Sequence, residues 1–274
     1  MTAAPLLASC RAAGVLDPHG PISAAERLIL INSTAIMLVV VVPVILLTLG
    51  FAWWYRASNS RAAYEPGWVY SGQIEMVIWA IPAMVVILLA GVGWTGSHQL
   101  DPAQKLASEA KPLRIQGVSL DWKWLFIYPD QGIATVNQLV IPAGTPIEFL
   151  LSSGSVMDAF FVPQLGSQIY TMPGMSVRLN LMAQSAGEYP GFSSQFSGDG
   201  FSDMRFMVHA LSAAQFSGWL ERSRGSGAAL DTGSFAGLAA PGTAPAGVYG
   251  SVAPHLYEWI VDTTAGLPAQ REAP

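Results

Sequence analysis

Charged residues are scarce in this chain. Asp, Glu, Lys and Arg make up only 11% of its 274 residues, whereas they make up about 25% of a typical soluble domain. Hydrophobic residues make up 51%, and 18 acidic residues outnumber 13 basic ones, for a formal net charge of −5. The chain has no basic surplus with which to bind a phosphate backbone, so we expect no nucleic-acid partner.

Cysteine and histidine are scarcer still. The single cysteine, Cys10, excludes an intrachain disulfide. Thiolates and imidazoles are the ligands that soft and borderline metal ions prefer. The chain has four histidines, which are scattered along the sequence: His19, His98, His209 and His255. We therefore expect no soft-metal site in this chain.

Long charge-free stretches, by contrast, are present twice. One lies between Arg27 and Arg56 and the other runs from Met76 to Leu100. At about 1.5 Å per residue, roughly 20 residues cross the ~30 Å hydrocarbon core of a bilayer, so both stretches can span it. Two buried helices of a soluble core are disfavoured by the length and uniformity of the runs. We expect a transmembrane helical hairpin over residues 28–97, with spans at about 28–54 and 74–96.

Short alternating runs separated by Gly and Pro follow from about Lys111. Such runs predict strands, and their spacing predicts an all-β sandwich or Greek-key barrel over residues 111–222. A strand over residues 118–124 would place Trp122 and Trp124 on one face. The other expected strands are residues 147–151, 177–181 and 206–210.

The remainder, residues 223–274, is expected to form a tail. Gly, Ala, Pro, Ser and Thr dominate residues 223–254, and such a composition buries too little apolar surface to offset the entropy of ordering. We therefore expect a loose segment there. The apolar residues 256–261 are expected to dock back as a short helix.

Several motifs together resemble subunit II of the haem-copper terminal oxidases. They are Trp122-Lys123-Trp124 and residues 50–53, 55–59, 121–135, 162–170 and 172–175, and the likeness extends from Cys10 to about Arg222. In that family a transmembrane hairpin precedes a cupredoxin domain. The resemblance therefore implies a membrane-anchored all-β protein with a cupredoxin-like Greek-key β-sandwich.

The copper-binding members of the family hold a two-copper centre in the β-domain. The resemblance places Asp158 where the first histidine ligand stands, Ser193 and Ser197 where the bridging cysteines stand, and Gln195, Phe201 and Met204 at the remaining ligand positions. Of these, only Met204 matches the family's ligand, and we expect it to be a core residue. A mixed-valence copper pair needs thiolates and imidazoles, so we expect no metal in this domain.

Loss of the copper ligands is characteristic of the quinol-oxidising branch, and the chain looks like subunit II of the bacterial bo-type ubiquinol oxidases. This implies a non-catalytic subunit of a proton-pumping quinol:oxygen oxidoreductase, with ubiquinol as substrate of the complex. Haems and one copper would belong to the partner subunit I, further small membrane subunits would complete the complex, and no soluble cytochrome c would dock. The alternative is a free-standing cupredoxin-like membrane lipoprotein acting in oxidase assembly or copper delivery, which would be expected to carry surface Met or His clusters.

Glu75 is the acidic residue at the start of the second span. The resemblance implies that it stands at the mouth of a proton channel formed by the haem subunit. The other interpretation is a carboxylate in the first helical turn, favoured there by the helix dipole. The sequence leaves both interpretations open.

Cys10 closes the sequence Leu-Ala-Ser-Cys, which resembles a bacterial lipobox. On this interpretation residues 1–9 are the remnant of a lipoprotein signal, Cys10 is the lipid attachment site, and residues 10–27 and the β-domain are periplasmic. Counting Lys and Arg near the spans would instead place both termini in the cytoplasm. We give precedence to the lipobox and expect a multi-pass protein of the bacterial inner membrane.

Overall fold

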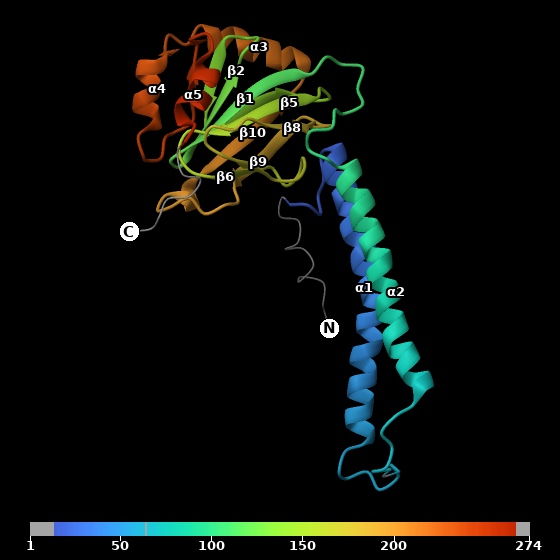
Figure 1. Ribbon diagram of the computed structural model, residues 1–274. Helices are drawn as coiled ribbons and strands as arrows, with labels where there is room; N and C mark the ends of the chain where they lie inside the picture. The colour runs from blue at the N-terminus through green and yellow to red at the C-terminus, as the bar shows by residue number, and fades with distance from the viewer. Residues whose placement is uncertain (1–13, 64, 267–274) are drawn as a thin grey trace, which may run out of the picture. The chain divides into compact units, whose positions relative to one another are not determined.

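The computed structural model describes residues 14–63 and 65–266 (Figure 1). Cys10 lies outside the described residues. The described chain divides into two compact units, one of residues 27–100 and one of residues 14–26 with residues 101–266. The first unit is helical and the second contains the β-sheets.

The helical unit consists of two long apolar helices, which lie side by side in Figure 1: α1 (Pro21–Trp54) and α2 (Gly72–Gln99). Gly96 of α2 is buried against Ile29 of α1. Their most apolar 18-residue windows have mean hydropathies of 2.8 and 2.4. Helices of 34 and 28 residues exceed the roughly 20 residues that a bilayer requires. The expectation of two helices able to span a membrane is confirmed, and the exact membrane boundaries stay predictions.

Helix α1 begins seven residues before the predicted span because its first turns belong to the β-containing unit. Pro21 occupies the first helical position, where the missing N–H costs nothing. Ile22 packs into the core of the β-sandwich, and the buried Ser23 hydroxyl donates to the carbonyl of Gln164 at 2.7 Å. The Ser167 hydroxyl donates to the carboxylate of Glu26.

The β-containing unit is a sandwich of two main sheets. Sheet A has the strand order β12-β3-β2-β1-β5-β8, and sheet B has the order β4-β10-β9-β6-β7. The pairs β1/β5 and β4/β10 are parallel and the other main pairs are antiparallel. The strands of the two sheets are β1 (Leu113–Leu120), β2 (Lys123–Tyr128), β3 (Ile133–Val136), β4 (Gln138–Pro142), β5 (Ile147–Ser153), β6 (Asp158–Phe161), β7 (Ile169–Thr171), β8 (Val177–Leu181), β9 (Gly187–Ser193), β10 (Arg205–Leu211) and β12 (Gly247–Tyr249).

An aromatic cluster fills the space between the sheets. Trp124 and Phe126 of β2 face Phe160 of β6 and Phe206 of β10, with ring centroids 5.2–6.2 Å apart. Trp124 and Phe160 are 0% exposed. Rings at such separations add to the free energy gained by burying their area. The expected strands at residues 147–151, 177–181 and 206–210 are confirmed as β5, β8 and β10.

The single strand predicted over residues 118–124 is wrong. Strand β1 ends at Leu120 and β2 begins at Lys123, so Asp121 and Trp122 form a two-residue turn in which Trp122 has a φ of 67°. In this hairpin Leu120 lies opposite Lys123, so even-numbered residues point to opposite sandwich faces before and after the turn. The alternation of apolar and polar residues over 118–124 therefore continues through a turn that reverses the chain. Trp122 and Trp124 do not share a strand face.

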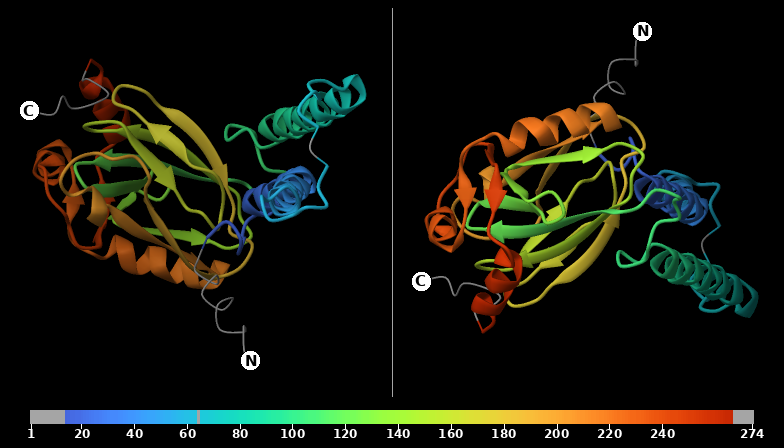
Figure 2. Two further views of the ribbon diagram at one scale, coloured as in Figure 1. Left: turned by 90° about the horizontal axis from the view of Figure 1, so that it is seen from below. Right: turned by 90° about the horizontal axis from the view of Figure 1, so that it is seen from above.

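The loose segment predicted for residues 223–254 is also wrong. This part of the chain forms the end of α3 (Ala213–Arg224), then β11 (Ala229–Leu230), α4 (Thr232–Ala239), β12 and β13 (Ser251–Val252). Strand β12 pairs with β3 at the edge of sheet A, and β11 pairs with β13. The expected docking of residues 256–261 is confirmed as α5 (Leu256–Thr264). Figure 2 shows α3 and α5 on opposite sides of the strands.

The segment is ordered because its few apolar residues cover the outer face of sheet A. Leu125 and Ile127 of β2 point away from the aromatic cluster and would otherwise be exposed to water. They form a second core with residues from strands β1 and β3 and from the C-terminal segment: Val118, Leu120, Ala134, Val136, Leu230, Phe235, Leu256, Tyr257 and Ile260. Average composition conceals these anchors, which is why it predicted a loose tail.

A buried lysine fixes the same segment by hydrogen bonds. Lys123 is 4% exposed, and its Nζ donates to the carbonyls of Leu238 at 2.9 Å and Ala240 at 2.7 Å. Beside it, the backbone N–H of Gly242 donates to the carbonyl of Asp121 at 3.3 Å. The β1–β2 turn and the C-terminal segment therefore hold each other.

Replacing Lys123 with Met keeps most of the side-chain volume and removes both hydrogen bonds. We expect Lys123→Met to lower the free energy of unfolding of the full chain by about 1–3 kcal/mol and to expose residues 238–242 to proteases. Urea unfolding and limited proteolysis in detergent measure both effects. Lys105→Met, which changes an exposed lysine, is the control, and equal behaviour of the two variants would contradict this assignment.

Candidate functional site

Four of the six residues that the resemblance places at copper-ligand positions lie together in the β-sandwich. Asp158 is the first residue of β6 and Ser193 the last of β9, while Ser197 and Met204 lie in the loop of residues 194–204 that joins β9 to β10. All four are buried. The Ser193 hydroxyl donates to Asp158 Oδ1 at 2.9 Å, and the Ser197 hydroxyl donates to Met204 Sδ at 3.9 Å.

The other two positions do not bring their side chains to this group. Gln195 contributes its carbonyl, which accepts a hydrogen bond from the Ser193 hydroxyl at 3.2 Å. The half-buried ring of Phe201 packs edge-on against Phe196, with centroids 5.7 Å apart. Phe196 is 71% exposed, so this pair lies at the surface of the loop.

Two further hydroxyls, which sequence reasoning missed, complete the group. The Ser119 hydroxyl of β1 and the Thr171 hydroxyl of β7 are 3.0 Å apart, and Thr171 is the register partner of Asp158. We call Asp158, Ser119, Thr171, Ser193 and Ser197 the Asp158 cluster. No local pattern marks Ser119 or Thr171, because only sheet pairing brings them to Asp158.

Burial dominates the electrostatics of this cluster. The pKa of Asp158 is raised from its ordinary value of 3.8 to about 6, chiefly by loss of hydration. The hydroxyls of Ser193, Ser197 and Ser119 oppose this shift, and the nearby charge of Asp121 adds to it. Asp158 Oδ2 is buried and no described residue makes a geometrically complete hydrogen bond to it. The hydroxyls therefore compensate only in part for the lost water.

Trp122 holds the 194–204 loop from the other side. Its indole N–H donates to the carbonyl of Ser197 at 3.2 Å. The ring lies over Gly198 and Gly200, and a Cβ built on Gly200 would stand 2.4 Å from it. Hydrogen bonding and ring packing therefore fix the loop that carries ligands in copper-bearing proteins of this fold.

These donors do not fit a two-copper centre. Hydroxyls, a carboxyl and a phenyl ring cannot replace the bridging thiolates and imidazoles that a mixed-valence pair requires, and Met204 alone supplies a soft atom. Among the described residues, no three His, Cys, Asp or Glu side chains are grouped as metal ligands would be. We derive no electron-transfer step through this domain.

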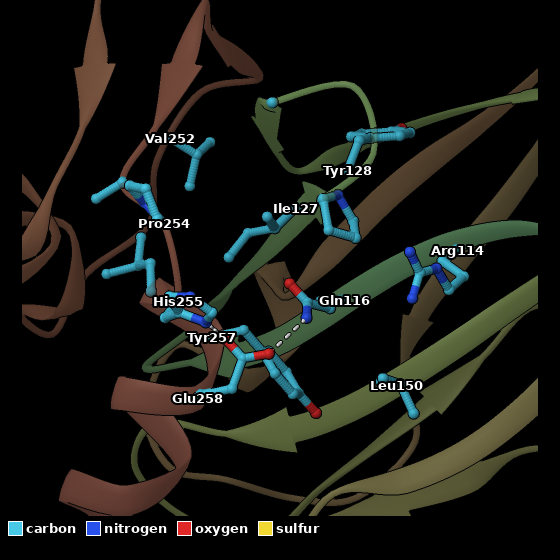
Figure 3. A pocket seen from close by; sticks show the side chains of 14 residues that line it. Arg114, Gln116, Ile127, Tyr128, Leu150, Val252, Pro254, His255, Tyr257 and Glu258 are labelled. Atoms are coloured by element: carbon cyan, nitrogen blue, oxygen red, sulfur yellow. Dashed lines mark hydrogen bonds and ion pairs between the residues drawn. The ribbon is translucent and has the colours of Figure 1, made fainter.

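A separate cleft of about 380 Å³ lies between sheet A and the C-terminal segment. Figure 3 shows Gln116 and Glu258 facing each other across it, with Nε2 and Oε1 3.3 Å apart. Arg114 is paired with Asp130 at 2.5 Å, and His255, with a φ of 60°, lies 4.0 Å from Glu258. The polar groups of the cleft thus pair with protein groups.

In the helical unit, Glu75 lies in the first turn of α2 with an exposed side chain, and its backbone N–H donates to the carbonyl of Ser71 at 3.0 Å. Both interpretations of this carboxylate fit that position. In the β-containing unit, His209 makes a contact within the sheet. Its Nδ1 lies 3.3 Å from Glu188 Oε1 across the β9–β10 pair.

Known proteins resemble the chain along nearly its whole length. Residues 129–211 match the family described as cytochrome c oxidase subunit II, periplasmic domain. Ubiquinol oxidase subunit 2 of Acetobacter aceti is 47% identical over 95% of this chain and 85% of its own length. Cytochrome bo(3) ubiquinol oxidase subunit 2 of Pseudomonas aeruginosa is 46% identical over 90% of this chain and 75% of its own length. The chain belongs to the ubiquinol oxidase subunit 2 family.

Membership in the ubiquinol oxidase subunit 2 family agrees with the resemblance inferred from the motifs. It also identifies the chain as a membrane protein with two spans followed by a cupredoxin-like domain. Among solved structures, the periplasmic domain of subunit II of cytochrome oxidase from Bradyrhizobium japonicum is 22% identical, with a TM-score of 0.40, over 43% of this chain and 96% of that one.

A methyl group at position 200 tests how tightly Trp122 packs on the loop. Gly200 has an unstrained φ of −93°, so Gly200→Ala acts through its clash with the indole and should destabilise the domain by about 1–3 kcal/mol. Gly227→Ala, where nothing lies within 4 Å of the added Cβ, should leave stability unchanged or slightly higher. Urea unfolding of the full chain followed by tryptophan fluorescence compares them, and an equally stable Gly200→Ala protein would argue against the contact.

Proposed function

We propose that this chain is a redox-inert second subunit of a proton-translocating ubiquinol oxidase, which oxidises ubiquinol and reduces oxygen to water in aerobic respiration. The replacement of the copper ligands by Asp158, Ser193, Ser197 and Phe201 carries the proposal. A cupredoxin-like domain without a redox centre cannot accept an electron from a soluble cytochrome. The electrons must then come from a carrier dissolved in the membrane, in line with the names of the relatives.

The proposal assigns the redox cofactors to a partner chain. Haems and one copper would lie in a haem-bearing subunit I, and further small membrane subunits would complete the complex. Helices α1 and α2 would pack in the bilayer with that subunit, since two apolar helices with mostly exposed side chains need lipid or protein around them. The β-domain would support subunit I on its outer side.

The proposed location is the bacterial inner membrane, with the N-terminus and the β-domain in the periplasm. Two spanning helices return the chain to the side of the membrane where it began. The N-terminus and the β-domain therefore lie on the same side. A lipid on Cys10 would require the outer side. The short loop between the helices, which contains Arg56 and Arg61, would then be cytoplasmic, although the larger number of basic residues beside the spans lies on the other side.

For Glu75 we propose a place at the mouth of a proton channel formed by the haem subunit. With the β-domain outside, the start of α2 faces the cytoplasm, which is the side that supplies protons. A carboxylate at the end of a membrane helix remains hydrated and ionisable at little cost. It can therefore collect protons without belonging to the reacting centre.

Purification of the chain from its native membranes tests the proposed complex. A tagged full chain should co-purify with a haem-bearing partner, and the preparation should consume oxygen with ubiquinol but not with reduced cytochrome c as the donor. Haem-free chain without such activity would instead favour a role in oxidase assembly or copper delivery.

Removing the carboxylate of Glu75 tests the proton path. In the assembled oxidase, Glu75→Gln should lower turnover at saturating ubiquinol on the order of tenfold, less than the loss at a reacting group, because water still reaches the channel. Glu65→Gln, which changes an exposed carboxylate between the helices, is the matched control. Unchanged turnover and proton pumping in Glu75→Gln would remove the channel assignment.

A further inference from the structure

The Asp158 cluster contains a buried carboxyl group whose lost hydration is only partly replaced by hydrogen bonds from the protein. Asp158 is 0% exposed, and the Oδ1 atom accepts one hydrogen bond, from Ser193. The Oδ2 atom is buried without a geometrically complete hydrogen bond from any described residue. A carboxylate in such a position loses hydration that the neighbouring hydroxyls restore only in part.

The charges around Asp158 also disfavour its ionised form. No ion pair among the described residues includes Asp158. Asp121, in the neighbouring β1–β2 turn, is buried and disfavours a second negative charge. The charge of Lys123 attracts that of Asp121, and its Nζ donates to two carbonyls of the C-terminal segment. On the loop itself, Asp199 and Asp203 are exposed to solvent.

The cluster is also attached to the 194–204 loop. Ser193 lies immediately before the 194–204 loop, and Ser197 lies within it. The Ser193 hydroxyl donates to Asp158 and the Ser197 hydroxyl lowers its pKa, whereas Ser119 and Thr171 approach from the sheets. Opening the loop would bring water to the carboxyl group, so the loop and the charge of Asp158 are linked.

We propose that Asp158 is a proton-binding site, and that the bound proton keeps the 194–204 loop closed over the position that copper occupies in related domains. The protonated carboxyl can donate from Oδ2 and carries no charge beside Asp121. The deprotonated form places a second carboxylate in the same buried region. The proposal concerns the β-domain alone and does not depend on the proposed function.

The sign of the pH effect follows from the direction of the pKa shift. Burial raises the pKa of Asp158 to about 6, whereas its ordinary value is 3.8. Closure is therefore most favourable below pH 3.8 and becomes less favourable as the pH rises through 6. If opening restores the ordinary pKa, the equilibrium constant for opening increases by up to about a hundredfold across this interval.

Hydrogen exchange of the loop amides tests the linkage. The full chain in detergent is followed between pH 4 and pH 8, with exchange corrected for its intrinsic pH dependence. In the wild type, opening of residues 194–204 should increase by tens of fold across this range, and Asp158→Asn should remove the dependence. Asp203→Asn, which removes an exposed carboxylate from the same loop, should retain it. A pH-independent wild type, or the same pH dependence in Asp158→Asn, would overturn the proposal.

Infrared spectroscopy supplies a second readout that does not require Asp158→Asn to fold. The carbonyl band of a protonated carboxylic acid should titrate near pH 6 in the wild type. In Ser193→Ala the midpoint should move upward, because a donor that favours the carboxylate is lost. No such band, or an unmoved midpoint, would refute the proton site. Stabilisation of the loop by Na⁺, Mg²⁺ or Ca²⁺ at fixed pH would likewise refute it, by identifying a metal ion as the occupant.

Discussion

The need to bury both faces of sheet A governs the β-containing unit. All six residues of β2 are buried. Because their side chains alternate between the two faces of the sheet, both faces must be covered by other parts of the protein. Trp124 and Phe126 point into the aromatic cluster between the sheets, and Leu125 and Ile127 point to the opposite side, where the C-terminal segment covers them. The β1–β2 turn is therefore held from two directions, by Lys123 on the C-terminal segment and by Trp122 on the 194–204 loop. This arrangement orders the loop by packing and hydrogen bonding between protein groups.

The resemblance implies that copper-binding members of the family hold the corresponding loop with metal bonds, whereas in this chain hydrogen bonds and packing hold it. Bonds to copper are strong and directional, and hydroxyl-to-carboxyl hydrogen bonds contribute only about 1 kcal/mol each. The additional contribution comes from enclosed side chains, namely Met204 in the core and the indole of Trp122 over two glycines. The residue at the position of the first histidine has remained buried and ionisable. On the proposed account, a group that binds a proton stands at the position that the resemblance assigns to a metal ligand.

Much of the architecture could be predicted from the sequence because its signals are local. Charge-free length predicted both helices, and apolar alternation predicted β5, β8 and β10. The predictions that failed depended on distant contacts. The β1–β2 turn preserved an alternating pattern through a reversal, and the cover for Leu125 and Ile127 comes from residues more than a hundred positions later. Helix α3 was missed although its capping box, formed by Ser212 and Gln215, is a local signal. For the site, the degenerate positions followed from motifs, whereas Ser119, Thr171 and the burial of Asp158 required the sheet pairing.

The central claim is that the β-domain is folded and ordered without a bound redox metal. Copper titration of the purified full chain tests it most directly, with metal content, near-infrared absorption and thermal unfolding followed together. The account predicts no near-infrared band of a mixed-valence pair and no increase in the melting temperature on addition of copper. Two tightly bound copper ions per chain, accompanied by that band, would contradict it.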